Sequence, residues 1–264
     1  MEGYYRTIAK SIGANRRLGQ NFLINENIAT AEAEYANGLN AIELGPGLGI
    51  LTKELCRKAK RVVAIEKDSR LVAALKSSIE SDRLELIEGD FLEMDVGQFN
   101  PIDIMVSNIP YNLSSKVVYW LCRNGIPALI CVQKEFSEHM LAKAGTRDYS
   151  KLSVVSALQF RVHHVRNVGA GNFYPRPRVD SCMIYLVPRH FDIDDRTLSV
   201  MTLIMNHKKK RLRNAIVDSS SGFGITKKEA SEIAMELPYP EKRPFQMEPE
   251  DVYGTSALLA SMLK

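Results

Sequence analysis

An amide, a proline and an aromatic ring follow one another in the segment SNIPYN (107–112), directly after an apolar run. An exocyclic amine on a nucleic-acid base is a weak nucleophile, because its lone pair is delocalised into the ring. The side-chain oxygen of Asn108 and the carbonyl of Ile109 are two acceptors that can bind both amine hydrogens and favour a pyramidal nitrogen. Pro110 restricts the local backbone, and Tyr111 offers a face for base stacking. The segment predicts an amine-binding site; the structural alternative is a tight turn with a core tyrosine.

A glycine-rich turn, ELGPGLG (43–49), lies between a short apolar run and a helical pattern. Gly45 and Gly47 let the backbone approach a ligand at the start of a helix. A dinucleotide fingerprint, GxGxxG, would need glycine where this chain has Ile50, so a pyrophosphate site is not favoured. Taken alone, the turn is also compatible with a purely structural role.

Two acidic residues lie at the ends of the next two predicted strands. Glu66 ends VVAIE, where a carboxylate can accept both ribose hydroxyls, and Asp90 follows LIEG, where it can accept an amino hydrogen of adenine. Each acid alone would be read as a turn former or a solvated side chain. Because ligands bind at the carboxyl ends of parallel strands, we expect both acids and the glycine turn to form an adenosine site. Such a site without a phosphate cradle suits S-adenosylmethionine.

The elements that must position these residues alternate along the first two thirds of the chain. Predicted strands cover 41–44, 62–65, 84–88, 102–106 and 128–132, and predicted helices cover 48–58, 68–81, 114–123 and 134–143. Ser114 or Ser115 is expected to cap the third helix, and Gly125 to end it. This alternation predicts an α/β fold with a mostly parallel, Rossmann-like sheet between helices.

The pattern changes after residue 151. A helix is predicted over 152–160, and two strands, 163–168 and 182–187, suit a hairpin added to the sheet. From residue 194 onward the periodicity is helical only. We therefore expect a catalytic domain over 1–188 and a small all-α domain over 189–264.

Composition limits the class of protein. The chain has 264 residues, 45% of them hydrophobic and 25% charged, and no apolar run or leader typical of membrane or secreted proteins. Its four cysteines form no CxxC pair, so we expect a cytoplasmic protein without a disulfide framework or a metal site.

The net charge of +4 is concentrated in three basic clusters. Their residues are Arg16 and Arg17; Arg176 and Arg178; and Lys208, Lys209, Lys210 and Arg211 in HKKKRLR. Each cluster alone could be a solvated surface, but three on a nearly neutral chain favour a polyanionic partner.

Several motifs together resemble the KsgA-type family of ribosomal RNA adenine dimethyltransferases. The resemblance is carried by LGQNFL (18–23), ELGPGLGILT (43–52), EGDF (88–91), NIPY (108–111), VQKEF (132–136), NFYPRPRVDS (172–181) and HKKKRLRNAI (207–216). LGQNFL and FYPRPRVDS are far more specific than NxPY, which many amino-group methyltransferases share. The last motif resembles a basic helix that opens the small domain of the family.

The resemblance implies transfer of four methyl groups from S-adenosylmethionine to two adjacent adenosines in a hairpin loop near the 3′ end of small-subunit (16S) ribosomal RNA. It also implies a pre-ribosomal particle as substrate, late in assembly, and the default expectation is a monomer. The implied cofactor-binding residues are Asn21, Leu23, Gly45, Gly47, Glu66, Asp90 and Asn108; the implied catalytic residues are Asn108, Ile109, Pro110, Tyr111 and Phe173, with Phe173 flanking the flipped base. A core position is the alternative for Phe173.

Other functions stay open at this point. They are a large-subunit ribosomal RNA adenine methyltransferase of the antibiotic-resistance type, a DNA adenine methyltransferase, and an assembly factor for which methylation is secondary. A nicotinamide-dependent dehydrogenase is disfavoured by Ile50 and by the absence of a Tyr-x-x-x-Lys element. We expect no extended basic tail or targeting peptide, which argues against the organellar relatives that also act in transcription.

Overall fold

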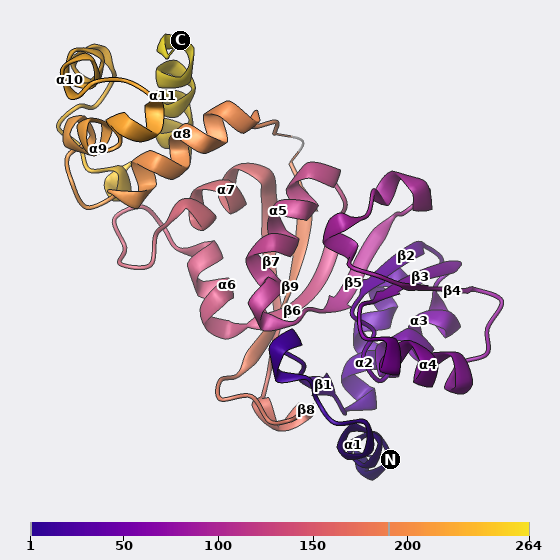
Figure 1. Ribbon diagram of the computed structural model, residues 1–264. Helices are drawn as coiled ribbons and strands as arrows, with labels where there is room; N and C mark the ends of the chain where they lie inside the picture. Colours follow the sequence, from indigo (N-terminus) through magenta and orange to yellow (C-terminus); the bar gives the residue numbers. More distant parts are fainter. Residues whose placement is uncertain (1, 190, 264) are drawn as a thin grey trace. The chain divides into compact units, whose positions relative to one another are not determined.

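The computed structural model describes residues 2–189 and 191–263. The chain divides into two compact units, Met1–Ser137 with Val162–Pro188 and Glu138–Arg161 with Arg189–Lys264 (Figure 1). The single domain boundary expected near residue 188 therefore differs from the observed division, because 138–161 group with the C-terminal helices.

A seven-stranded sheet forms the centre of the first unit, in the order β4-β3-β2-β5-β6-β9-β7 (Figure 1). Its strands are β2 (Asn40–Leu44), β3 (Arg61–Glu66), β4 (Leu84–Glu88), β5 (Ile104–Asn108), β6 (Ala128–Gln133), β7 (Phe160–Val168) and β9 (Ser181–Pro188). Strands β2 to β6 are parallel, and β9 pairs with β6 in the antiparallel sense. Runs of apolar residues buried on both faces produce this parallel sheet, so the α/β prediction is confirmed.

Strand β5 ends two residues later than predicted, at Asn108. Pairing with β6 continues to the end of the strand, where Asn108 lies opposite Cys131 and the Ile109 amide donates to the Cys131 carbonyl at 3.3 Å. Strand β5 begins at Ile104. Just before it, the Asp103 side chain accepts a hydrogen bond from the Asn40 backbone amide, and Pro101 has no backbone N–H for a strand hydrogen bond. The shift places Asn108 on the strand itself, where the sheet holds its backbone.

The helices of the first unit are α1 (Glu2–Ile12), α2 (Glu26–Ala33), α3 (Ile50–Lys58), α4 (Ser69–Ser78) and α5 (Ser114–Asn124), with α6 (Lys134–Leu141) crossing the division. Helices α1 and α2 were not predicted. Asn25 caps α2 by accepting from the Asn27 amide, and Ala29 and Ala33 pack in the core shared with α3. Neither serine caps α5: Leu113 is its N-cap, and the Ser114 hydroxyl donates to the Tyr111 carbonyl. Gly125 ends the helix, as predicted, at a φ of 60°.

A separate two-stranded sheet joins the two most specific motifs. Strand β1 (Phe22–Leu23) pairs with β8 (Phe173–Tyr174), so that Phe22 faces Tyr174 and Leu23 faces Phe173. The Ile24 amide extends the contact by donating to the Asn172 carbonyl at 2.9 Å. The loop between β7 and β9 is therefore held against the N-terminal segment.

The second unit contains α7 (Lys151–Gln159), α8 (Asp195–Asn206), α9 (Leu212–Asp218), α10 (Lys227–Glu236) and α11 (Pro249–Met262). Tyr149 explains why α7 belongs here: it is 1% exposed, and its hydroxyl donates to the Met247 carbonyl at 2.9 Å. The Gly145 amide donates to the Phe245 carbonyl. These bonds tie the segment before α7 to the segment before α11.

Two further findings concern the described residues as a set. None of their helices is long and apolar enough to cross a membrane, and no group of three or more His, Cys, Asp and Glu is arranged to hold a metal ion. None of the four cysteines forms a disulfide with another described residue; Cys131 and Cys182 are buried, and Cys56 and Cys122 are half-buried.

Candidate active site

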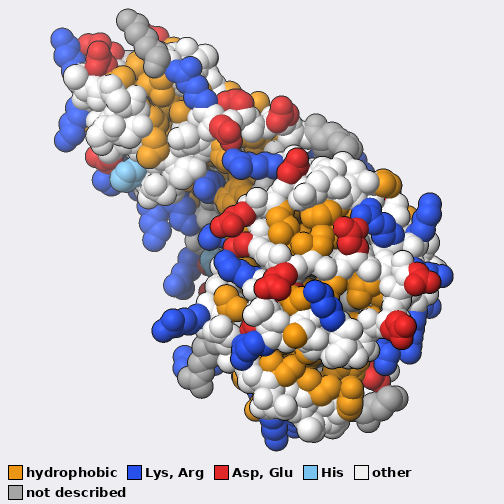
Figure 2. Space-filling model, turned by 45° about the vertical axis from the view of Figure 1, so that its right-hand side comes forward, with side chains coloured by type: hydrophobic (Ala, Val, Ile, Leu, Met, Phe, Trp, Pro, Cys, Tyr) orange, Lys and Arg blue, Asp and Glu red, His pale blue; other side chains and the backbone are white. Residues whose placement is uncertain are grey.

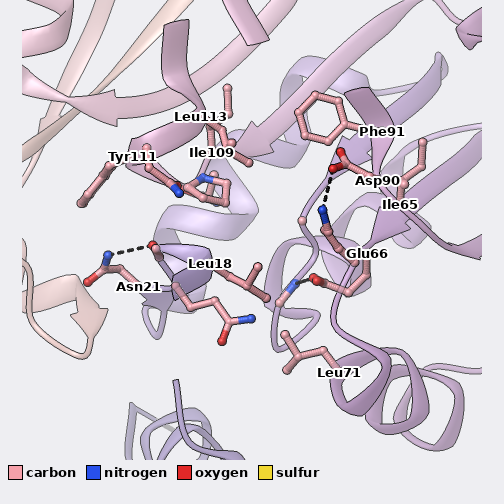
Figure 3. A pocket seen from close by; sticks show the side chains of 18 of the residues that line it. Leu18, Asn21, Ile65, Glu66, Leu71, Asp90, Phe91, Ile109, Tyr111 and Leu113 are labelled. Carbon is pink, nitrogen blue, oxygen red and sulfur yellow. Dashed lines mark hydrogen bonds and ion pairs between the residues drawn. The ribbon is translucent and has the colours of Figure 1, made fainter. Parts of the chain in front are cut away.

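A cavity of about 290 Å³ lies at the carboxyl ends of the parallel strands in the first unit (Figure 3). Its walls come from the segment before β1, the turn after β2, the ends of β3 and β5, the loop after β4, and β8. The predicted site residues that line it are Arg17, Asn21, Gly45, Gly47, Glu66, Asp90, Asn108, Ile109, Pro110, Tyr111 and Phe173. Residues from distant parts of the sequence thus meet at the sheet edge where we expected them.

The glycine turn brings backbone close to this cavity. Gly45 and Gly47 have φ values of 67° and 58°, a region that residues with a Cβ rarely adopt. A Cβ on Gly47 would come within 3.1 Å of the Phe22 ring, so the turn also packs directly on the N-terminal segment. Both glycines are therefore needed for the shape of the turn.

Glu66 at the end of β3 is 5% exposed and is held by two backbone amides. Its Oε2 accepts from the Gly47 amide at 3.1 Å (Figure 3), and its Oε1 accepts from the Asp68 amide at 2.9 Å. Burial raises the pKa of Glu66, while these amides and the amide of Lys67 oppose the shift. Each carboxylate oxygen has a second lone pair, so the group can accept two ribose hydroxyls while staying fixed.

Each oxygen of the Asp90 carboxylate has a partner within the protein. Its Oδ1 accepts from the Leu92 amide at 3.0 Å, and its Oδ2 is paired with Lys67 Nζ at 2.7 Å (Figure 3). Lys67, which also lines the cavity, was missed in the sequence, although it directly follows Glu66. The pair leaves second lone pairs on the Asp90 carboxylate for an adenine amino group.

Apolar side chains that were not predicted also line the cavity. Ile65, Leu71, Phe91, Leu92 and Leu113 are among them, and Figure 3 shows Phe91 beside Asp90. The Phe91 ring is fixed edge-on against Trp120, with ring centroids 6.3 Å apart. A flat heterocycle can be bound between such walls, with the carboxylate reading its edge.

The two ends of the Asn108 side-chain amide differ in their hydrogen bonding. Its Nδ2 donates to Glu32 Oε2 at 2.8 Å, while its Oδ1 is buried and has no hydrogen-bond partner among the described residues. A buried amide oxygen without a donor is costly, by about 1–3 kcal/mol, so its retention beside a cavity indicates a ligand donor. An amine hydrogen is such a donor.

Tyr111 and Phe173 are the aromatic residues of the predicted target pocket. The Tyr111 hydroxyl is bonded to Ser181 Oγ at 2.7 Å, which fixes the ring at its far end. Burial raises the pKa of Tyr111 to about 12, so the phenol is neutral and serves as an apolar face. Phe173 is 3% exposed and belongs to the hydrophobic core as well as to the cavity wall. Phe173 is therefore a core residue that also borders the cavity, and its role beside a flipped base stays a prediction.

Leu23 does not line the cavity. Neighbouring residues of a strand point to opposite sides, so Phe22 faces the cavity and Leu23, 4% exposed, packs in the core with α2 and α3. Asn21 lines the cavity, and its Nδ2 donates to the Gly19 carbonyl at 3.2 Å.

The N-terminal and loop clusters of basic residues differ in position. Arg17 is exposed at the cavity, and the Arg16 side chain lies outside the described part of the structure. Arg176 and Arg178 are exposed but do not line the cavity.

The third basic cluster is not helical. Helix α8 ends at Asn206 and α9 starts at Leu212, and the chain leaves the helix because the Leu212 amide bonds to the Lys242 carbonyl. Most of the cluster has internal partners: Lys208 Nζ donates to the Tyr149 carbonyl, Lys210 pairs with Asp218, and Arg211 pairs with Glu241. Lys209 is exposed and has no partner among the residues described.

Comparisons with known proteins show the family of this chain. The family profile described as "Ribosomal RNA adenine dimethylase" matches residues 12–247. The "Probable ribosomal RNA small subunit methyltransferase A" of Thermococcus gammatolerans is 37% identical over 253 residues, covering 93% of this chain and 89% of the relative. A crystal structure of a dimethyladenosine transferase from Plasmodium falciparum is 26% identical, with a TM-score of 0.75, covering 91% of this chain and 98% of that one.

A second solved structure is similar in fold. It is the 23S ribosomal RNA methyltransferase ErmE, 24% identical with a TM-score of 0.58, covering 90% of this chain and 100% of that one. The profile match over most of the chain, together with the identity to the Thermococcus gammatolerans relative, shows the relationship directly. The chain belongs to the ribosomal RNA adenine dimethylase family.

Proposed function

We propose that this protein dimethylates the N6 amines of two adjacent adenosines in the 3′-terminal hairpin loop of small-subunit ribosomal RNA. The family makes the chain an S-adenosylmethionine-dependent methyltransferase, and the Thermococcus gammatolerans relative is named for the small subunit. The observation that carries the proposal is the Asn108 amide beside the cavity, with its nitrogen bound to Glu32 and its oxygen left for a ligand.

The residues present fit the cofactor. Glu66 would accept the ribose hydroxyls, Asp90 the adenine amine, and the Gly45–Gly47 turn would contact the cofactor through its backbone. When bound, S-adenosylmethionine supplies an electrophilic methyl group, transferred as the amine lone pair forms the C–N bond and the C–S electron pair remains on sulfur.

Asn108 and Ile109 prepare the amine for this step. Asn108 Oδ1 and the Ile109 carbonyl accept the two amine hydrogens, which keeps the nitrogen lone pair out of the ring and directed away from both acceptors. The proton that the nitrogen loses passes to water. After the first transfer one N–H remains, and one of the two acceptors is enough to hold it for the second transfer.

Tyr111 would stack on the target base, and this role can be separated from its hydroxyl bond. Tyr111→Ala is expected to lower kcat/KM for RNA by about 5–150-fold, the range for losing one base–aromatic stack of roughly 1–3 kcal/mol. Tyr111→Phe keeps the ring and loses only the bond to Ser181, so its kcat/KM should stay within about threefold of wild type. Equal losses in both variants would assign the effect to the hydroxyl and not to stacking.

RNA contacts are proposed for Arg16, Arg17, Arg176, Arg178 and Lys209, mainly to phosphates. Figure 2 shows charges of both signs interspersed over the visible face, so binding must rely on particular clusters. Lys208, Lys210 and Arg211 already have partners in the second unit; the two exposed ion pairs can open for phosphates at little cost, because such pairs contribute about 0–1 kcal/mol.

The salt dependence of particle binding tests these contacts. Lys209→Ala should lower the slope of log Kd against log salt by about one unit, since each phosphate contact releases close to one counterion. Lys228→Ala, which removes an exposed lysine of α10 outside the three clusters, is the matched control and should leave the slope unchanged. A slope that is the same in wild type and Lys209→Ala would exclude Lys209 from the RNA contact.

Transfer of tritiated methyl groups to unmethylated small subunits, followed by nucleoside mapping, tests the proposed function. We expect two adjacent dimethyladenosines in the 3′ hairpin loop and four methyl groups per particle. Label in a single adenosine of the large-subunit RNA would favour the function named for ErmE, whose fold is similar. Tight particle binding without transfer would favour an assembly factor. We also propose that the enzyme is a monomer, that it is cytoplasmic, and that it acts late in the assembly of the small subunit.

A further inference from the structure

A buried carboxylate lies behind Asn108, outside the cavity wall. Glu32, in the last turn of α2, is 2% exposed and does not line the cavity. Its Oε2 accepts the hydrogen bond from Asn108 Nδ2 at 2.8 Å. Burying an ionised carboxylate is costly unless it is hydrogen-bonded, and the Asn108 amide is the hydrogen-bond partner of this one.

The direction of the bond determines which end of the amide is left for the ligand. A carboxylate can only accept hydrogen bonds, so the Asn108 amide must turn its NH₂ group toward Glu32. The oxygen is then the branch that remains for the target amine. A protonated Glu32 carboxyl can also donate a hydrogen bond, so it would permit the reversed orientation of the Asn108 amide as well. In that orientation the amide would present its NH₂ group to the target amine, which instead needs an acceptor for its hydrogen.

We propose that Glu32 is a positioning residue for methyl transfer, whose carboxylate holds the Asn108 amide in the orientation that accepts the amine hydrogen. This inference rests on the function proposed above, because the orientation matters only if Asn108 holds an amine. The carboxylate acts through Asn108 and does not touch the substrate.

The charged and titratable groups around Glu32 give the pair a pH dependence. Burial raises the pKa of Glu32 to about 8, and the Asn108 bond and the positive charge of Arg166 on β7 oppose this shift. Glu43 on β2 is also buried, with its pKa raised to about 8, and its charge interacts unfavourably with that of Glu32. Cys131 on β6 stays a neutral thiol, because burial raises its pKa well above the usual range.

The sign of the effect on activity follows from these groups. Above about pH 8 the Glu32 carboxylate is ionised and the Asn108 amide has one orientation. Below that pH, Glu32 is protonated and allows both orientations of the amide. Catalysis should therefore rise as the pH increases through the pKa of Glu32. Arg166→Gln removes a charge that favours the ionised form, so it should move this rise to higher pH.

The first test compares wild type with Glu32→Gln between about pH 6.5 and about pH 9.5. A glutamine can donate or accept, so it cannot select the orientation; kcat at high pH should fall by between about tenfold and about a hundredfold, and the rise with pH should disappear. The KM for S-adenosylmethionine should stay within about twofold. A pH profile and kcat equal to those of wild type would overturn the proposal.

Glu54→Gln is the matched control. Glu54 is also a buried carboxylate of the first unit, but it pairs with Arg57 at 2.6 Å and lies outside the cavity wall. This variant should retain both the profile and the kcat of wild type. The melting temperature of Glu32→Gln provides a folding check and should rise relative to wild type as the pH increases, because the ionised carboxylate is the costly buried form.

A second test is independent of activity. In protein labelled with ¹⁵N at asparagine side chains, the Asn108 NH₂ resonances should shift with pH around 8 in wild type and stay constant in Glu32→Gln. If methyl transfer to adenosine is absent while this titration is present, the proposed function fails and the Glu32–Asn108 coupling stands. If transfer occurs and the titration is absent, only the inference about Glu32 fails.

Discussion

Replacing Asn108 with alanine is expected to reduce kcat for methyl transfer by about 10²–10³-fold, the effect of deleting one preorganised hydrogen-bonding group at a reacting centre. The loss follows from the single free acceptor at this position, Oδ1, which has no partner among the residues described. The measurement is single-turnover transfer of labelled methyl groups to unmethylated small subunits. Particle binding should be largely retained, because Asn108 makes no phosphate contact in this account.

Asn108→Asp separates the acceptor from the rest of the side chain. It keeps the Oδ1 acceptor but replaces the Nδ2 donor with a second oxygen, and it places a second carboxylate about 3 Å from Glu32. One of the two acids must then hold a proton, so the variant should be less active than wild type and should lose stability as the pH rises.

The contradicting result concerns the alanine variant. If Asn108→Ala retained methyl-transfer activity within about tenfold of wild type, the amide would not be the group that holds the amine.

Glu66→Ala is expected to weaken binding of S-adenosylmethionine by about 3 kcal/mol or more, which is at least a hundredfold in Kd. The substitution removes both acceptors for the ribose hydroxyls. It also leaves the Gly47 and Asp68 amides without the carboxylate that they bind, so the glycine turn loses its support. Isothermal titration with the cofactor measures the effect directly.

Glu88→Ala provides the matched control for Glu66→Ala. Glu88 lies opposite Glu66 at the end of the neighbouring strand β4, but it does not line the cavity, so the cofactor Kd should be unchanged. Because the pKa of Glu66 is raised, cofactor binding should weaken as the pH falls through that value and the carboxylate becomes protonated. Equal Kd values for Glu66→Ala and Glu88→Ala would remove Glu66 from the cofactor site.

Much of the cavity was predictable because local patterns determine it. Apolar runs place the strands, the residues that end them share one edge of a parallel sheet, and this is enough to bring Glu66, Asp90 and Asn108 together. The two most specific motifs meet through β1 and β8, but strands of two residues are too short to predict from periodicity.

Other features depend on contacts that no local pattern encodes. Glu32 would be read as a solvated acid in the sequence, and only the packing of α2 shows that it is buried against Asn108. In the sequence, Lys67 looks like any surface lysine, and only the fold shows that it pairs with Asp90. The basic cluster 207–211 has a helical composition but lies in a turn, because the backbone of α9 bonds to residues near 242.

The central claim is that one cavity holds the cofactor and the target amine, and binding of a conjugate tests it most directly. The ligand would join the N6 nitrogen of adenosine by a short linker to the position of sulfur in an S-adenosylmethionine analogue. We predict that it competes with both the cofactor and the RNA, and that Asn108→Ala and Glu66→Ala each weaken it. Competition with the cofactor alone, together with full affinity in Asn108→Ala, would contradict the account.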